Sequence, residues 1–171
     1  NLDELDSIRP DVVFASAALS QQDTVALQQM DAQVVILPRA DSIEGMRENY
    51  ITAATILDGK LDGKANGQRI FTRLQQRFDA LEAAAQSVSE RPSAIFLRLT
   101  PLVMATGDTF EGELLELLGM DNAAKEFTGW AYPEDKAVDL YPDIIFYDQS
   151  IDPQYLKDTK IYNTTDAVKQ G

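Results

Sequence analysis

The chain has 171 residues, with 15 Lys and Arg against 28 Asp and Glu, so its net charge at pH 7 is −13. This charge argues against a nucleic-acid surface, which needs clustered cationic side chains to displace counterions from phosphates. The sequence contains neither Cys nor His, which excludes disulfides, thiolate nucleophiles, Cys-ligated zinc and the imidazole base of most hydrolase triads.

Short apolar runs alternate with helical patterns in the first part of the chain, as expected of an α/β fold with a largely parallel sheet. Strands are predicted at 12–15 and at 33–37, where Pro38 ends the second one. Helices are predicted over 22–30 and from about 41 to 57. Three glycines follow and are expected to interrupt regular structure, namely Gly59, Gly63 and Gly67.

A longer amphipathic helix is predicted over about 65–90, because apolar residues recur there at spacings of three and four. These residues are Ile70, Leu74, Phe78, Leu81, Ala85 and Val88. At a rise of 1.5 Å per residue, about 25 residues reach roughly 38 Å, which is more than one βα unit needs. We expect this helix to connect two lobes. The alternative is a crossover helix packed on a single sheet.

The part of the chain after the long helix again combines strands and helices. Strands are predicted at 94–97, 102–105, 144–147 and 160–162. Between them, Asp108 and Thr109 cap a helix predicted over 110–118, and Gly119 ends it. An aromatic loop then leads to a second helix that is predicted to start at Pro133.

An internal repeat pairs residues 3–14 with residues 135–146. Each copy has an acid seven positions before a Pro-Asp pair, followed by an apolar run that ends in Phe. Each is predicted to be a short helix, a Pro that stops it, and a strand that enters a sheet. Two copies, one on each side of the long helix, indicate two similar lobes.

In their order and spacing these features resemble the helical-backbone, or class III, substrate-binding proteins of ABC importers. The resemblance covers essentially the whole chain, and it is carried by the two Pro-Asp units, the long helix and the stretch 107–123. It implies an α/β fold of two Rossmann-like lobes joined by one long helix. The parts would be residues 1–60 from the N-terminal lobe, 61–91 as the inter-lobe helix, and 92–171 as most of the C-terminal lobe. The start of the first lobe and the end of the second are expected to lie outside this fragment.

The resembled family consists of extracytoplasmic receptors that hold ferric siderophores, cobalamin, haem or related metal chelates between the lobes and deliver them to a membrane permease. We therefore expect a periplasmic or extracellular solute receptor that is not an enzyme and has no resident cofactor or metal ion. Its partners would be the chelate and an ABC permease, with no nucleic acid, and it would meet the membrane only through the permease or a lipid anchor outside this fragment. The alternatives are a flavodoxin-like α/β enzyme, or a sensor or adhesion domain with the same fold.

Seven residues that follow strands or occupy the aromatic loop are candidates for ligand binding. They are Ser16, Arg39, Arg98, Thr100, Trp130, Tyr132 and Asp148. Arg98 interrupts an apolar strand, which is costly unless its charge reaches a cleft or a partner, so it is favoured over Arg39. Trp130 can cover a planar chelate, and the phenol of Tyr132 can donate a hydrogen bond or ligate iron as phenolate. The alternative for Trp130 is that it fills the core of the second lobe.

The resemblance also implies that one acidic residue on each lobe, usually Glu, docks with arginines of the permease. The matching positions hold Asp3 and Asp135, and Glu4 and Glu134 are adjacent to them. The alternative is that these four acids remain solvated and only complement the positive ends of helix dipoles.

Overall fold

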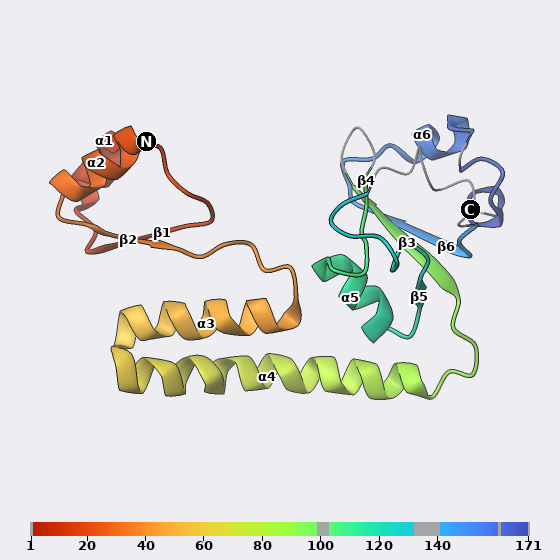
Figure 1. The fold of residues 1–171 in the computed structure, drawn as a ribbon, viewed down its shortest axis with the longest axis horizontal. Helices are drawn as coiled ribbons and strands as arrows, with labels where there is room; N and C mark the ends of the chain where they lie inside the picture. The colour runs from red at the N-terminus through yellow and green to blue at the C-terminus, as the bar shows by residue number, and fades with distance from the viewer. Residues whose placement is uncertain (1, 99–102, 132–140, 161, 171) are drawn as a thin grey trace. The chain divides into compact units, whose positions relative to one another are not determined.

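The computed structural model describes residues 2–98, 103–131, 141–160 and 162–170. The chain divides into two compact units (Figure 1). Unit 1 comprises Asn1–Ala40 and Glu44–Phe71, and unit 2 comprises Asp41–Ile43 and Thr72–Gly171. No described helix is both long enough and apolar enough to cross a membrane.

Unit 1 contains a two-stranded parallel sheet in which Val12 lies opposite Gln33. The Ser20 side chain caps the second helix by accepting a hydrogen bond of 3.1 Å from the Asp23 amide. Leu27 on that helix is buried. The elements in chain order are α1 (Leu2–Ile8), β1 (Val12–Ala15), α2 (Gln21–Gln29), β2 (Gln33–Ile36), α3 (Ile43–Asp58) and the first part of α4 (Lys60–Gln86).

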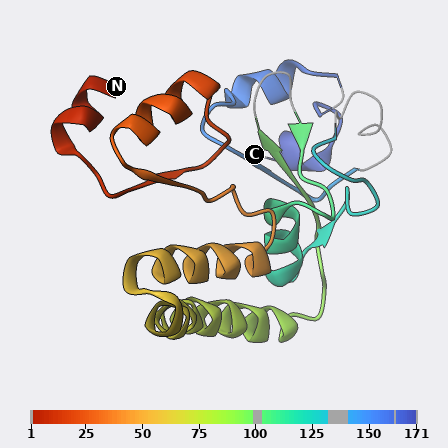
Figure 2. The same ribbon diagram turned by 60° about the vertical axis from the view of Figure 1, so that its left-hand side comes forward.

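Helices α3 and α4 lie side by side (Figures 1 and 2). The prediction that Gly63 and Gly67 interrupt regular structure is wrong, because both are buried inside the continuous helix α4. A Cβ atom on Gly63 would lie only 2.2 Å from the Ala54 carbonyl oxygen, and one on Gly67 only 2.6 Å from the Ile51 Cα. Glycine is therefore required here because the missing side chains let the two helix backbones approach closely.

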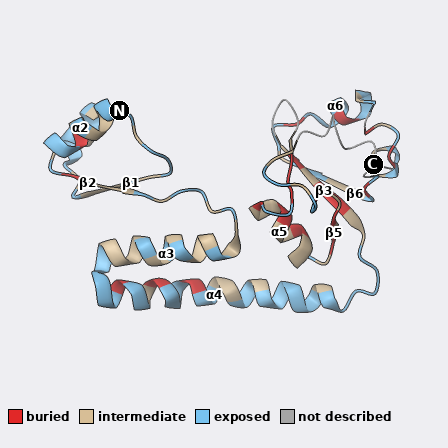
Figure 3. Cartoon of the chain, viewed as in Figure 1, coloured by how far each residue is buried: buried red, intermediate tan, exposed pale blue. Residues whose placement is uncertain are grey.

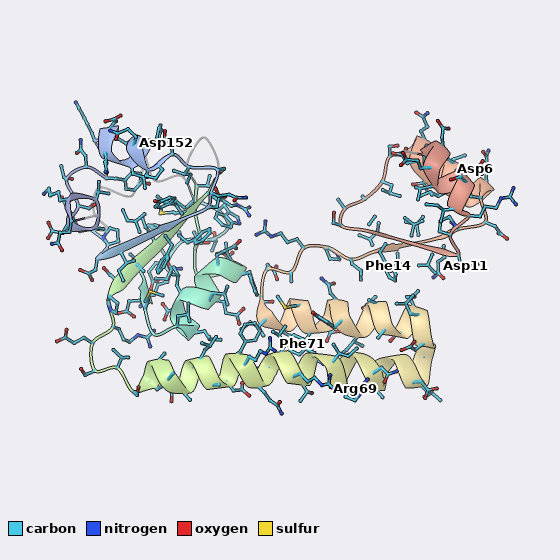
Figure 4. All side chains as sticks on the ribbon, turned by 180° about the vertical axis from the view of Figure 1, so that it is seen from behind. Asp6, Asp11, Phe14, Arg69, Phe71 and Asp152 are labelled. Atoms are coloured by element: carbon cyan, nitrogen blue, oxygen red, sulfur yellow. The ribbon has the colours of Figure 1, made fainter. Side chains whose placement is uncertain are left out.

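Helix α4 is continuous over 27 residues and runs from unit 1 into unit 2, which confirms the prediction of one long helix. The predicted apolar face is wrong in part: Ile70 is 42% exposed, whereas its neighbour Phe71 is only 3% exposed. Phe71, which is labelled in Figure 4, packs against Tyr50 with a ring-centroid distance of 5.9 Å. The buried face of α4 is set by its contact with α3, so it passes through Gly63, Gly67 and Phe71 (Figure 3).

Unit 2 contains a second, separate sheet with β3 at its centre. Strand β4 pairs with β3 antiparallel, while β5 and β6 pair with it parallel. Ile95 and Leu97 belong to one buried cluster, and Ala94 belongs to another with Leu115 and Met120. The elements that follow α4 are β3 (Ser93–Arg98), β4 (Val103–Met104), α5 (Phe110–Leu117), β5 (Asp121–Asn122), β6 (Ile144–Tyr147), α6 (Pro153–Asp158) and α7 (Asp166–Lys169).

The predicted strand at 160–162 is wrong at the residues that are described. Lys160 and Tyr162 lie in turns, and Tyr162 is only 1% exposed. The side chain of Tyr162 packs in the cluster that contains Ile95 and Leu97. This apolar position therefore fills the core from a turn, which a short apolar run cannot distinguish from a strand.

The internal repeat is also present in the backbone conformation. Arg9 and Tyr141 occupy equivalent positions before Pro10 and Pro142, and both have positive φ values, of 49° and 35°. A residue before proline is disfavoured in the right-handed helical region, so the helix α1 ends there. A strand follows in each copy, β1 in unit 1 and β6 in unit 2. The helix predicted from Pro133 lies outside the described residues.

Candidate functional site

Arg98 lies at the end of β3 and shares a sheet face with Phe96. Successive side chains of a strand point to opposite faces, so Phe96 and Arg98 lie on the face opposite the one formed by Ile95 and Leu97. Phe96 packs against the cluster that includes Leu115 of α5. The Arg98 guanidinium reaches the first turn of the same helix, where its Nη1 lies 3.9 Å from Glu111 Oε1.

Trp130 stacks on this face of β3. The Cζ atom of Arg98 lies 3.5 Å from the centroid of the indole, a cation–π contact. The ring of Phe96 meets the indole edge-on, with centroids 6.5 Å apart and an interplanar angle of 70°. Trp130 remains partly exposed, and among the described residues it contacts the core only through Phe96.

Asp148 follows β6 and lies beside Arg98. Leu97 is opposite Tyr147 in the sheet, and the Asp148 amide donates a hydrogen bond of 3.1 Å to the Leu97 carbonyl, which continues the register by one residue. Hydrogen bonds from the hydroxyl and the amide of Ser150 lower the pKa of Asp148, and the charge of Arg98 adds a smaller lowering. Asp148 is therefore a carboxylate at neutral pH.

The Arg98 side chain is mostly buried, with 21% exposed, and its Nε–H has no hydrogen-bond partner among the described residues. A guanidinium carries five N–H donors, and burying an unused one is unfavourable. Its ion pair with Glu111, at 3.9 Å, is also longer than a charge-assisted hydrogen bond of about 2.8 Å. Among the described residues, Arg98 is therefore held by a cation–π contact and a long ion pair, and not by a short charge-assisted hydrogen bond to a carboxylate.

The other candidate residues are either exposed in unit 1 or outside the described residues. Ser16 and Arg39 are exposed residues of unit 1 that follow β1 and β2. Asp3 and Glu4 are exposed in the first turn of α1. Outside the described residues lie Thr100, Tyr132, Glu134 and Asp135.

Phe96 and Glu111 also belong to this site but are not among the residues predicted from the sequence. Phe96 was identifiable, because a residue two positions before Arg98 on a strand must share its face. Glu111 was not, because its contact with Arg98 depends on how α5 packs on the sheet. Within the described ranges, no cluster of acidic side chains could hold a metal ion.

A separate pocket of about 270 Å³ lies between the end of α4 and α5 in unit 2. Arg91 lines it, and its guanidinium is paired with Glu116 at 2.8 Å and with Asp121 at 3.5 Å. The cationic charge of this pocket is therefore compensated locally. None of the predicted ligand-binding residues that the structure describes lines it, which leaves the Arg98 and Trp130 pair as the candidate site.

Comparison with known families shows to which family the chain belongs. A family model described as periplasmic binding protein matches residues 1–171. The chain belongs to this family. The family consists of binding proteins that act outside the cytoplasm and are not enzymes, so membership confirms these predictions. It also excludes the alternative of a flavodoxin-like enzyme.

One relative is the uncharacterized ABC transporter substrate-binding lipoprotein YvrC of Bacillus subtilis, which is 26% identical over 174 residues. The match covers 99% of this chain and 55% of YvrC, so the chain spans about half the length of that relative.

Solved structures share the fold at lower sequence identity. A possible iron-binding periplasmic protein of Staphylococcus epidermidis aligns with a TM-score of 0.80 at 18% identity, covering 99% of this chain and 68% of that one. The haem-binding protein HutB of Vibrio cholerae aligns with a TM-score of 0.79 at 17% identity, with coverage of 99% and 68%. The haem complex of IsdE from S. aureus aligns with a TM-score of 0.72 at 18% identity, with coverage of 99% and 69%. These likenesses confirm the predicted fold class.

Proposed function

We propose that this chain is part of a solute receptor of an ABC importer, which captures a metal chelate and delivers it to a membrane permease. The observation that carries the proposal is the Arg98 guanidinium stacked on Trp130 at the ends of β3 and β6. Ligands of open α/β sheets bind in the crevice outside the carboxyl ends of parallel strands. The haem complexes among the structures that share this fold make haem the first ligand to test, followed by cobalamin and ferric siderophores.

The chemistry of the pair suits a planar chelate that carries carboxylates. One face of the indole is covered by Arg98, and the partly exposed remainder is available to stack on a macrocycle. A carboxylate of the ligand would pair with the Nη1 end of the Arg98 guanidinium and replace the long contact with Glu111. Further contacts are proposed for Ser16, Arg39, Thr100, Tyr132 and Asp148.

Permease docking belongs to the same proposal. One acid of unit 1, either Asp3 or Glu4, would pair with a permease arginine. One acid in the second copy of the repeat, either Asp135 or Glu134, would pair with another. These ion pairs would set the orientation and the association rate of the receptor–permease complex more than its affinity. Attachment to the membrane through a lipid anchor outside these residues fits the description of YvrC as a lipoprotein. Asp3→Lys and Asp135→Lys should slow transport in a salt-sensitive manner and leave ligand affinity nearly unchanged.

The binding test is a titration with haem, cyanocobalamin and ferrichrome, followed by visible absorbance and calorimetry. We expect saturable binding of one chelate class. Trp130→Ala should weaken that binding by about tenfold, the factor that a stacking contact of about 1–1.5 kcal/mol supports. Tyr155→Ala is the matched control, because Tyr155 is an exposed aromatic residue on α6 and its loss should change nothing. Failure of all three chelates to bind would favour a sensor or adhesion role.

A further inference from the structure

The loop that carries Trp130 is fixed on both sides of that residue. On one side, Ala131 and Met104 exchange two backbone hydrogen bonds, of 2.8 and 3.2 Å, which join the loop to β4. On the other side, the Gly129 amide donates a hydrogen bond of 2.7 Å to Asp108 Oδ1. The indole therefore projects from a backbone segment held by one bridge to a strand and by one carboxylate.

Asp108 also connects this loop to the start of α5. It directly precedes Thr109, the N-cap of that helix. Its Oδ1 accepts a second hydrogen bond, of 2.7 Å, from the hydroxyl of Thr106. Thr106 is completely buried, and its hydroxyl also contacts the Gly129 carbonyl. The carboxylate thus ties a rigid, buried turn to the residue next to Trp130.

The protonation state of Asp108 suits this role. The hydrogen bond from Thr106, followed by that from the Gly129 amide, lowers the pKa of Asp108. The side chain is therefore ionised at neutral pH and acts as an acceptor toward both donors.

We infer that Asp108 is a positioning residue, whose carboxylate holds Gly129 so that the indole of Trp130 stays stacked on the Arg98 guanidinium. Without that acceptor the Gly129 amide loses its partner, and among the described contacts the bridge at Ala131 and the contact of the Thr106 hydroxyl with the Gly129 carbonyl remain to fix the loop. The indole then samples other orientations, and a ligand must order it on binding. The consequence for ligand affinity rests on the proposed function, whereas the consequence for the indole does not.

The chain contains a single Trp, so fluorescence excited selectively at tryptophan, and not at tyrosine, reports on Trp130 alone. The experiment compares the wild type with Asp108→Ala and Asp108→Asn, using the emission maximum and quenching by acrylamide. The asparagine variant keeps an acceptor oxygen in the same place, and the alanine variant keeps none. Glu126→Ala is the matched control, because Glu126 is an exposed acid at the start of the same loop region. Far-UV circular dichroism checks that each variant is folded.

We expect Asp108→Ala to shift the emission of the ligand-free protein to longer wavelength and to increase quenching, while Asp108→Asn and Glu126→Ala stay close to the wild type. Asp108→Ala should also weaken haem binding by about tenfold, the scale of a lost hydrogen bond to a charged group. If Asp108→Ala does not fold, Asp108→Ser replaces it, because its shorter side chain also withdraws the acceptor.

Two results would overturn the inference. One is emission and quenching in the alanine or serine variant that equal the wild-type values, and the other is an asparagine variant that behaves like the alanine variant. A wild-type protein that binds none of haem, cyanocobalamin and ferrichrome, combined with the expected fluorescence changes, would contradict the proposed function and leave the positioning role supported.

Discussion

Units 1 and 2 contain the same local sequence unit in different surroundings. In both, a residue with positive φ precedes a Pro and a strand follows. In unit 2, β3 is paired on both edges, and Ile95 and Leu97 are completely buried. Among the described residues of unit 1, β1 pairs with β2 alone, and Phe14 and Ile36 remain 38% and 42% exposed. Local sequence therefore sets the turn and the strand, whereas the number of neighbouring strands and helices sets how deeply the strand is buried (Figure 3).

The largest expected effect is a difference between equivalent core truncations in the two units. Leu97→Ala removes a completely buried side chain from the centre of the larger sheet and should cost about 3–5 kcal/mol. Leu27→Ala, on the helix beside the two-stranded sheet, should cost about 2–3 kcal/mol. Urea unfolding measured by circular dichroism gives both values.

Trp130 lies in unit 2, so its fluorescence sharpens the same comparison. Leu97→Ala should lower the urea midpoint of the fluorescence transition more than Leu27→Ala does. Equal shifts from the two variants would show that the units are equally well packed, against the difference in burial.

The second prediction concerns the helical pair of unit 1. Gly63→Ala should destabilise by about 1–3 kcal/mol, because its Cβ would meet the Ala54 backbone at 2.2 Å. This is the net cost that remains after the gain of about 1 kcal/mol that alanine brings to a helix interior, because a backbone atom 2.2 Å from the Cβ forces the two helices apart. Gly59→Ala is the control for conformation without crowding: φ is 84° and no atom lies within 4 Å of the new Cβ, so about 1 kcal/mol is expected. A Gly63→Ala protein as stable as the wild type would mean that the two helices can move apart freely.

The third prediction compares two helix caps. The side chain of Thr109 accepts a hydrogen bond from the Gly112 amide at the start of α5, and Thr109 is buried. Ser20 caps α2 in the same way but is exposed. Thr109→Ala should cost about 1–2 kcal/mol and Ser20→Ala about 0.5 kcal/mol, because water replaces only the exposed cap. Thermal unfolding measures both, and the reverse order would contradict the comparison.

The smallest effect is expected from acid. The pKa values of Asp108 and Asp148 in unit 2 are lowered by hydrogen bonds, and the pKa of Glu44 in unit 1 is lowered by Arg47. A lowered pKa in the folded state contributes stability above the ordinary carboxyl pKa, and that stability is lost as the pH falls through the lowered value. Stability should therefore be unaffected by these groups between pH 7 and 5 and decrease below about pH 4.

Salt separates the contributions of the two units to this acid effect. High salt screens the charge attraction between Glu44 and Arg47, whereas the hydrogen bonds of Glu44 and of Asp108 are not removed by screening. In 1 M NaCl, Glu44→Gln should therefore have a smaller effect on the acid limb of the stability curve than at low salt, and Asp108→Asn should flatten that limb as much as at low salt. A curve that Asp108→Asn leaves unchanged at both salt concentrations would contradict the role of its hydrogen bonds.

The sequence by itself determined the alternation of strands and helices, the long helix and the repeated Pro-Asp units, because these depend on interactions between residues close along the chain. It also identified Arg98 as unusual, since a charge within an apolar strand is costly wherever the strand lies. The order of these features was sufficient to indicate the family.

Only the tertiary structure decided which distant side chains meet. Trp130 stacks on Arg98, Glu111 reaches the same guanidinium, and Tyr162 fills the core from a turn. The glycines of α4, which favour a break when only neighbouring residues are considered, are required inside the helix because α3 lies against them. Such contacts join residues far apart along the chain, so they are set by the packing of whole elements and leave no local pattern in the sequence.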